Sequence, residues 1–83
     1  MYSQNYSEWR TSSIKKSIRT YKKRIEEHEY KIKNPEKVYD HWGKFENHEK
    51  DSRISHWEKE IRNFRSEMCA ATKELRKREA ENG

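Results

Sequence analysis

The 83-residue sequence is 29% hydrophobic and 42% charged, with a formal net charge of +5. Its length excludes an assembly of several large domains, and the lack of an apolar run of about 18 residues excludes a membrane-spanning helix. A single cysteine excludes an internal disulfide and is typical of a reducing compartment. No apolar leader segment is visible, so we expect a cytoplasmic protein.

Residues 14–33 form the first predicted helix, and residues 1–13 are an N-terminal segment whose conformation stays open. Within residues 14–33, apolar or ring-bearing residues recur at alternating intervals of four and three, which is typical of a helical heptad seam. The seam consists of Ile14, Ile18, Tyr21, Ile25, His28 and Ile32. The Asn34-Pro35 pair predicts the helix end, because proline disfavours helical backbone at the residue before it.

Residues 51–78 form the second predicted helix, capped by Asp51 or Ser52 and followed by a frayed tail at 79–83. Its seam consists of Ile54, Trp57, Ile61, Phe64, Met68, Ala71 and Leu75. The connector at 34–50 is longer than the roughly 2–8 residues that usually join two helices. We therefore expect its apolar residues to fold over the closed end as an aromatic cap. These residues are Val38, Tyr39, Trp42 and Phe45.

The two seams predict an all-α fold, an antiparallel two-helix hairpin resembling a coiled coil, in a single helical domain spanning 1–83. Ile14 should face Leu75, and Ile32 should face Trp57. On one edge this register places Glu29 near Glu58, a like-charge pair that a second copy docked head to tail would relieve. A homodimeric four-helix bundle is thus an alternative way to complete the core of so small a domain.

Positive charge concentrates where the ends of this hairpin would meet, because no acid occurs between Glu8 and Glu26. Cations near a helix start oppose its dipole, which favours an anion-binding role, although a solvated surface explains the pattern equally well. The candidate residues are Arg10, Lys15, Lys16, Arg19, Lys22, Lys23, Arg24, Arg65, Arg76 and Lys77.

Tyr6 and Trp9 stand beside this basic stretch and outside the heptad phase. Such rings can stack on bases or fill a partner's pocket, and they can also simply cover a helix end. We treat both as candidate contact residues.

The sequence predicts no enzyme, no metal and no cofactor. His41, His48 and His56 are separated by seven and eight residues, whereas zinc ligands usually occur as closely spaced pairs. The letters around His41 and His48 suggest an HNH nuclease, but nothing supports the β-hairpin that such a site needs. No glycine-rich phosphate loop is present.

Residues 28–64 contain Ile32-x-Asn34-Pro35, then Trp42, then Ile54-x-His56-Trp57-x-Lys59-Glu60-Ile61, then Phe64. This pattern resembles a helix–Asn-Pro–Trp–helix segment of bacterial polymorphic-toxin and phage-associated proteins. The resemblance implies an origin in bacteria or their mobile elements. It assigns no catalytic residue.

We expect a non-enzymatic module that binds a larger protein and inhibits or bridges it, as immunity proteins and anti-defence inhibitors such as anti-CRISPRs do. A DNA- or RNA-binding protein that uses the basic open end is one alternative. A structural homo-oligomer is another. The residues alone do not identify the partner.

Overall fold

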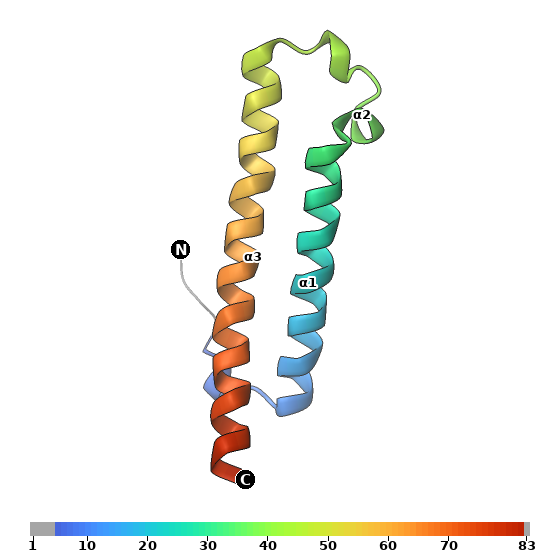
Figure 1. Ribbon diagram of the computed structural model, residues 1–83. Helices are drawn as coiled ribbons and strands as arrows, with labels where there is room; N and C mark the ends of the chain where they lie inside the picture. The colour runs from blue at the N-terminus through green and yellow to red at the C-terminus, as the bar shows by residue number, and fades with distance from the viewer. Residues whose placement is uncertain (1–4, 83) are drawn as a thin grey trace.

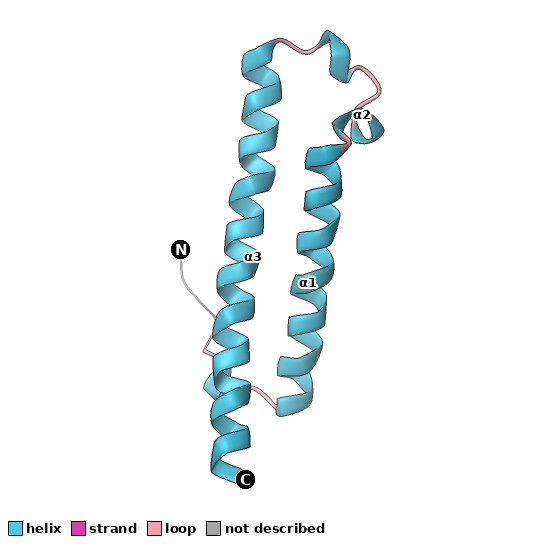
Figure 2. Cartoon of the chain, in the orientation of Figure 1, coloured by secondary structure: helices cyan, strands magenta, loops and turns pink. Residues whose placement is uncertain are grey.

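The computed structural model describes residues 5–82, which form an antiparallel helical hairpin (Figure 1). Its elements are η1 (Tyr6–Glu8), α1 (Thr11–Lys33), α2 (Pro35–Val38), η2 (Trp42–Lys44) and α3 (Asn47–Asn82). The two long helices, α1 and α3, lie side by side, and no strand occurs within the described residues (Figure 2). The predicted all-α hairpin is therefore confirmed. None of the described helices is long and apolar enough to cross a membrane.

Helix α1 begins at Thr11, three residues before its predicted start, and ends at Lys33. The backbone N–H of Asn34 donates to the carbonyl of Tyr30 at 2.9 Å, which closes the last turn. Pro35 then opens α2 at a position where its missing N–H costs nothing. The chain therefore turns where the Asn-Pro pair predicts.

Helix α3 is longer than predicted, since it begins at Asn47 instead of 51 and extends to Asn82 instead of 78. Asp51 and Ser52, the expected caps, lie inside the helix. The carbonyl of Glu46 accepts the N–H groups of Glu49 and Lys50, both at 3.0 Å, and so starts the first turn. Neither proline nor glycine interrupts the sequence from 47 to 82, so nothing stops the helix earlier.

The core at the open end is built around Ile14 and Ala71, which are fully buried. Leu75, the predicted partner of Ile14, packs against the same cluster, together with Ile18. Tyr6 completes the cluster from the N-terminal segment. The segment that sequence periodicity leaves unplaced is thus an integral part of the core.

The closed end is covered by aromatic rings from the connector. The ring of Tyr39 stacks on Trp57 with centroids 6.1 Å apart, and Trp42 stacks on Trp57 at 6.4 Å. The Arg53 guanidinium lies over Tyr39 and Phe45, at 4.6 and 4.9 Å from the ring centroids. An aromatic cap therefore forms. Val38 differs from the prediction, because its side chain is exposed.

Candidate binding surface

A groove runs between α1 and α3 on one edge of the hairpin. Its apolar lining is Ile32, which is half-buried, and Ile61, which is buried. Its charged lining consists of Glu29, Lys33, Glu58, Arg62 and Arg65. The groove therefore combines an apolar floor with charged walls of both signs, as protein-binding grooves do.

One ion pair crosses this groove. An Arg65 guanidinium nitrogen lies 3.4 Å from a carboxylate oxygen of Glu29, and both side chains are largely exposed. Glu29 and Glu58 line this groove together, as the register predicts. Arg65 supplies an opposite charge to Glu29 from the facing helix, which offsets part of the predicted repulsion.

The walls of the groove continue toward the open end as an all-basic surface. Lys15 and Lys22 precede Glu29 by 14 and seven residues, and Arg76 follows Arg62 by 14. Seven residues make about two helical turns and 11 make about three, so these residues share the edge that the groove defines. We call this surface the basic edge. It consists of Lys15, Lys22, Arg65 and Arg76.

The basic edge is exposed and carries almost no internal pairing. Within residues 5–82, Arg65 forms the only ion pair made by these four side chains, through its contact with Glu29. The nearby acids of α3, Glu67 and Glu74, bond instead to Tyr6 and Arg78. This edge therefore presents uncompensated positive charge to solvent.

The structure divides the ten predicted cations among several surfaces. Four of them, Lys15, Lys22, Arg65 and Arg76, lie on the basic edge. Helical spacing turns four others outward, away from the opposing helix; these are Lys16, Arg19, Lys23 and Lys77. Arg24 lies one turn before His28 on the opposite edge, and Arg10 precedes α1 as its N-cap. The predicted cluster is thus too broad.

One groove-side cation, Arg62, is absent from the predicted set although it lines the groove. The spacing from Arg62 to Arg76 is two heptads, which is the signal that could have identified Arg62. Composition by chain segment could not identify it, because acids surround it in sequence. One of them, Glu58, lines the same groove, and another, Glu60, bonds to His28 and His56.

On the opposite edge, the guanidinium of Arg78 forms hydrogen bonds within the protein. Its guanidinium donates to Glu74 at 2.8 Å, to the Thr11 hydroxyl at 3.0 Å, and to the backbone carbonyls of Tyr6 and Ser7 at 3.0 and 3.2 Å. These bonds hold the N-terminal segment against α3. Arg78 therefore has a structural role that its neighbour Arg76 lacks.

Tyr6 is buried in the core, with only 3% of its surface exposed. Its hydroxyl donates to Glu67 at 2.8 Å and accepts from Tyr21 at 2.9 Å. Burial, reinforced by these hydrogen bonds, raises the pKa of the Tyr6 phenol. Trp9 is half-buried and packs edge-on against Tyr6 at 4.8 Å. The prediction of Tyr6 as a partner contact is therefore wrong.

A second internal network joins the helices near their middle. The Nδ1 of buried His28 lies 2.8 Å from the carbonyl of Arg24, so that nitrogen donates, and Nε2 contacts the Glu60 carboxylate. The other Glu60 oxygen lies 2.7 Å from Nε2 of His56. Partial burial raises the pKa of Glu60, but the hydrogen bond from His28 and the charges of His28, His56 and Lys31 outweigh it and hold that pKa below its usual value.

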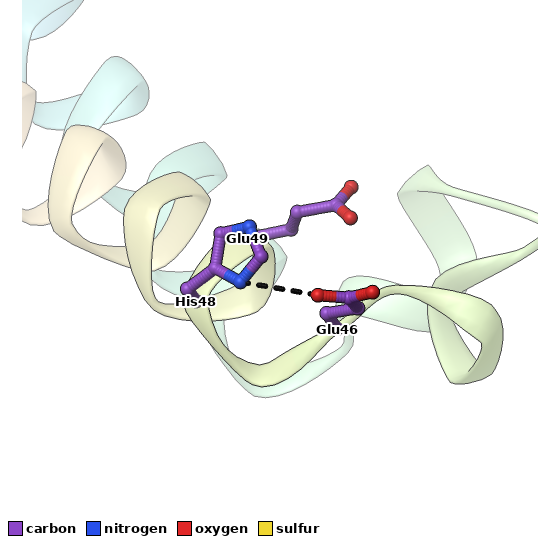
Figure 3. A group of neighbouring side chains, drawn as sticks. All are labelled: Glu46, His48 and Glu49. Atoms are coloured by element: carbon purple, nitrogen blue, oxygen red, sulfur yellow. Dashed lines mark ion pairs between the residues drawn. The ribbon is translucent and has the colours of Figure 1, made fainter.

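Glu46, His48 and Glu49 bring three metal-ligand side chains together at the start of α3 (Figure 3). All are exposed, and Nδ1 of His48 lies 3.4 Å from Glu46. The N-terminal end of α3 carries the positive end of the helix dipole, which disfavours a cation here. The carboxylates of Glu46 and Glu49 stabilise the helix at this end by themselves. The arrangement is thus explained by helix stability, and we assign no metal to it.

Ser52, His56 and Glu60 recur every four residues along one face of α3, in the order of a hydrolase triad. No hydrogen bond joins Ser52 to His56 in the described structure, and the helical N–H groups around them are already bonded within α3. No oxyanion hole is therefore available. The arrangement lacks what acyl transfer requires.

No family model, curated protein or solved structure matches this chain. The groove and the basic edge are therefore interpreted from their chemistry and geometry.

Proposed function

We propose that this protein is a non-enzymatic binding module that inhibits or bridges a larger protein, and that it docks through the groove between α1 and α3. The observation that carries the proposal is the apolar floor of Ile32 and Ile61 between charged walls. An amphipathic helix of a partner fits such a surface, because it buries apolar side chains in the groove and pairs its charges with the rims.

The rigidity of the groove supports this proposal. Its two walls are held together by the Ile14–Ala71 cluster at one end and by the aromatic cap at the other. The His28–Glu60 contact joins the same helices between these ends. Binding to a pre-organised surface of this kind loses little conformational entropy.

The proposed biological setting rests on the resemblance of residues 28–64 to polymorphic-toxin and phage-associated segments. In that setting the protein acts in a bacterial cytoplasm as an immunity or anti-defence protein. An anti-CRISPR activity would appear as restored plating of a targeted phage on bacteria that express this chain. Unchanged plating on a panel of CRISPR-active hosts would exclude that version.

Affinity purification with mass spectrometry, with and without nuclease, tests the protein-binding proposal. The double variant Glu58→Arg/Arg62→Glu reverses charges on one wall while preserving net charge, and both side chains are exposed. We expect it to lose a nuclease-resistant partner that the wild type retains. The control Lys23→Glu/Glu26→Lys makes the same kind of exchange on the outer surface of α1 and should retain it.

A partner that the groove variant and the control retain equally would contradict docking in the groove. Recovery of nucleic acid alone would contradict a protein partner. Light scattering on the same preparations tests the homodimer alternative, because a monomer at high concentration would exclude it.

A further inference from the structure

We infer that the basic edge is a second binding surface, distinct from the groove floor, and that it binds the phosphate backbone of double-stranded nucleic acid. The surface extends from Arg65, at the rim of the groove, toward the open end of the hairpin, whereas Ile32 and Ile61 form the groove floor nearer the closed end. Together the two surfaces would let one small chain contact a protein and a duplex simultaneously.

The cations of the basic edge form two rows, one on each helix. Lys15 and Lys22 are separated by about 10 Å along α1, and Arg65 and Arg76 by about 16 Å along α3, at 1.5 Å per residue. A duplex carries one negative charge per roughly 1.7 Å of its axis. A stretch as long as the α3 row therefore offers about nine phosphates, enough for every cation in both rows.

The fold gains nothing from leaving these charges unpaired. Lys15 lies in the first turns of α1, where positive charge opposes the helix dipole and where no acid occurs in the first turn. Lys22 faces the same edge as Arg65 without an acid between them. Among the lysines and arginines of residues 5–82, only Arg65 and Arg78 form ion pairs, so the basic edge is marked by the concentration of like charge near a helix start. A locally unfavourable arrangement on an exposed surface is typical of a binding site.

The lack of an aromatic ring on the basic edge favours a duplex over a single strand. The exposed ring of Tyr30 lies instead on another surface of α1, with Lys23 and Glu27. Proteins that bind single strands usually stack bases on exposed aromatic side chains. Tyr6 is buried and Trp9 packs against it on the opposite edge, while Tyr39, Trp42 and Phe45 form the cap at the closed end. The basic edge itself carries no ring among its described residues.

The same composition disfavours an acidic protein as the occupant. Protein interfaces are depleted in lysine and depend on buried aromatic or aliphatic anchors. Two of the four residues of the basic edge are lysines, and none is an apolar or aromatic anchor. Flexible cations without anchors suit a regular line of phosphates better.

Fluorescence anisotropy with labelled RNA and DNA duplexes of about 20 base pairs, across salt from about 50 to 300 mM, tests the inference on the full chain. For four phosphate contacts, we expect log affinity to fall against log salt with a slope of about −3.6. The two duplex arms show whether the surface distinguishes RNA from DNA.

The triple variant Lys15→Glu/Lys22→Glu/Arg76→Glu should weaken binding by more than about tenfold and reduce the salt slope by about three. The control Lys37→Glu/Lys44→Glu/Lys59→Glu makes the same change in net charge on exposed residues away from the basic edge. It should weaken binding far less. Circular dichroism of both variants checks that the helices are intact.

Three results would overturn the inference. One is an absence of binding to either duplex at about 50 mM salt. Another is an equal loss of affinity in the two triple variants, which would show that net charge alone attracts the duplex. The third is displacement of the labelled duplex by poly-L-glutamate as effectively as by unlabelled duplex, which would indicate an acidic protein surface instead.

Discussion

The two edges of the α1–α3 interface use their charged residues differently. On one edge, Arg78 bonds to Glu74 and to the N-terminal segment, and His28 bonds to Glu60. On the other, Arg65 pairs with Glu29 at an exposed position, while Lys15, Lys22 and Arg76 have no ion-pair partner among the described residues. The edge covered by residues 6–9 therefore holds the hairpin together through partly buried bonds, whereas the basic edge leaves most of its charge exposed.

The largest predicted loss of stability comes from a substitution in the core at the open end, against which the N-terminal segment packs. Replacing fully buried Ile14 by alanine should lower the free energy of unfolding by about 2–5 kcal/mol, because it leaves a cavity beside Ala71. Urea unfolding followed by circular dichroism measures this loss. Ile18→Ala, at a half-buried position, is the control, and an equal loss there would contradict the placement of the core.

Arg78 and Arg76 offer a direct comparison between the edges, two residues apart on one helix. Arg78→Gln should lower the free energy of unfolding by about 1–3 kcal/mol, because it removes charged hydrogen bonds that anchor the N-terminal segment. Arg76→Gln, on the exposed basic edge, should stay within about 0.5 kcal/mol of wild type. Equal losses in thermal unfolding would contradict the proposed division of roles.

A smaller, pH-dependent effect should come from Glu60. Its folded-state pKa lies below the usual value of 4.5, so its stabilising contribution is complete above that pH and is lost as the pH falls through the folded-state pKa. The stability of the Glu60→Gln variant should therefore change less with pH than that of the wild type. Urea unfolding midpoints at neutral and acidic pH measure this difference. Identical pH dependence in the two proteins would show that the His28–Glu60 contact is not an ion pair in solution.

The smallest predicted effect is a gain in stability on the basic edge. Lys22→Glu should raise the free energy of unfolding by about 0.2–0.5 kcal/mol, because it replaces repulsion toward Arg65 with attraction. High salt should reduce that gain. Lys44→Glu, near the closed end, is the control for net charge, and an equal gain there would show that the basic edge has no local repulsion.

Heptad spacing and the Asn-Pro pair suffice to predict the hairpin and the end of α1. They do not predict the start of α3, because Asp51 and Ser52 are good caps by composition yet can equally lie within a helix. The fold-back of Tyr6 also escapes prediction, since that residue is out of phase and reaches α3 only after the chain turns at Arg10.

The candidate surface is predicted only in part. The acid-free stretch from Trp9 to Ile25 correctly indicates excess positive charge on α1. It cannot separate Lys15 and Lys22 from Lys16 and Lys23, because adjacent residues point in directions about 100° apart on a helix. Only the pairing of α1 with α3 decides which cations share an edge.

The central claim is that one edge is bound internally while the other is free to bind. Titration of the ¹⁵N-labelled protein with an RNA duplex, followed by NMR, tests it most directly. We predict that amide resonances of Lys15, Lys22 and Arg76 shift, while those of Tyr6 and Glu67 do not. Shifts concentrated at Tyr6 and Glu67, or spread evenly along both helices, would contradict the claim.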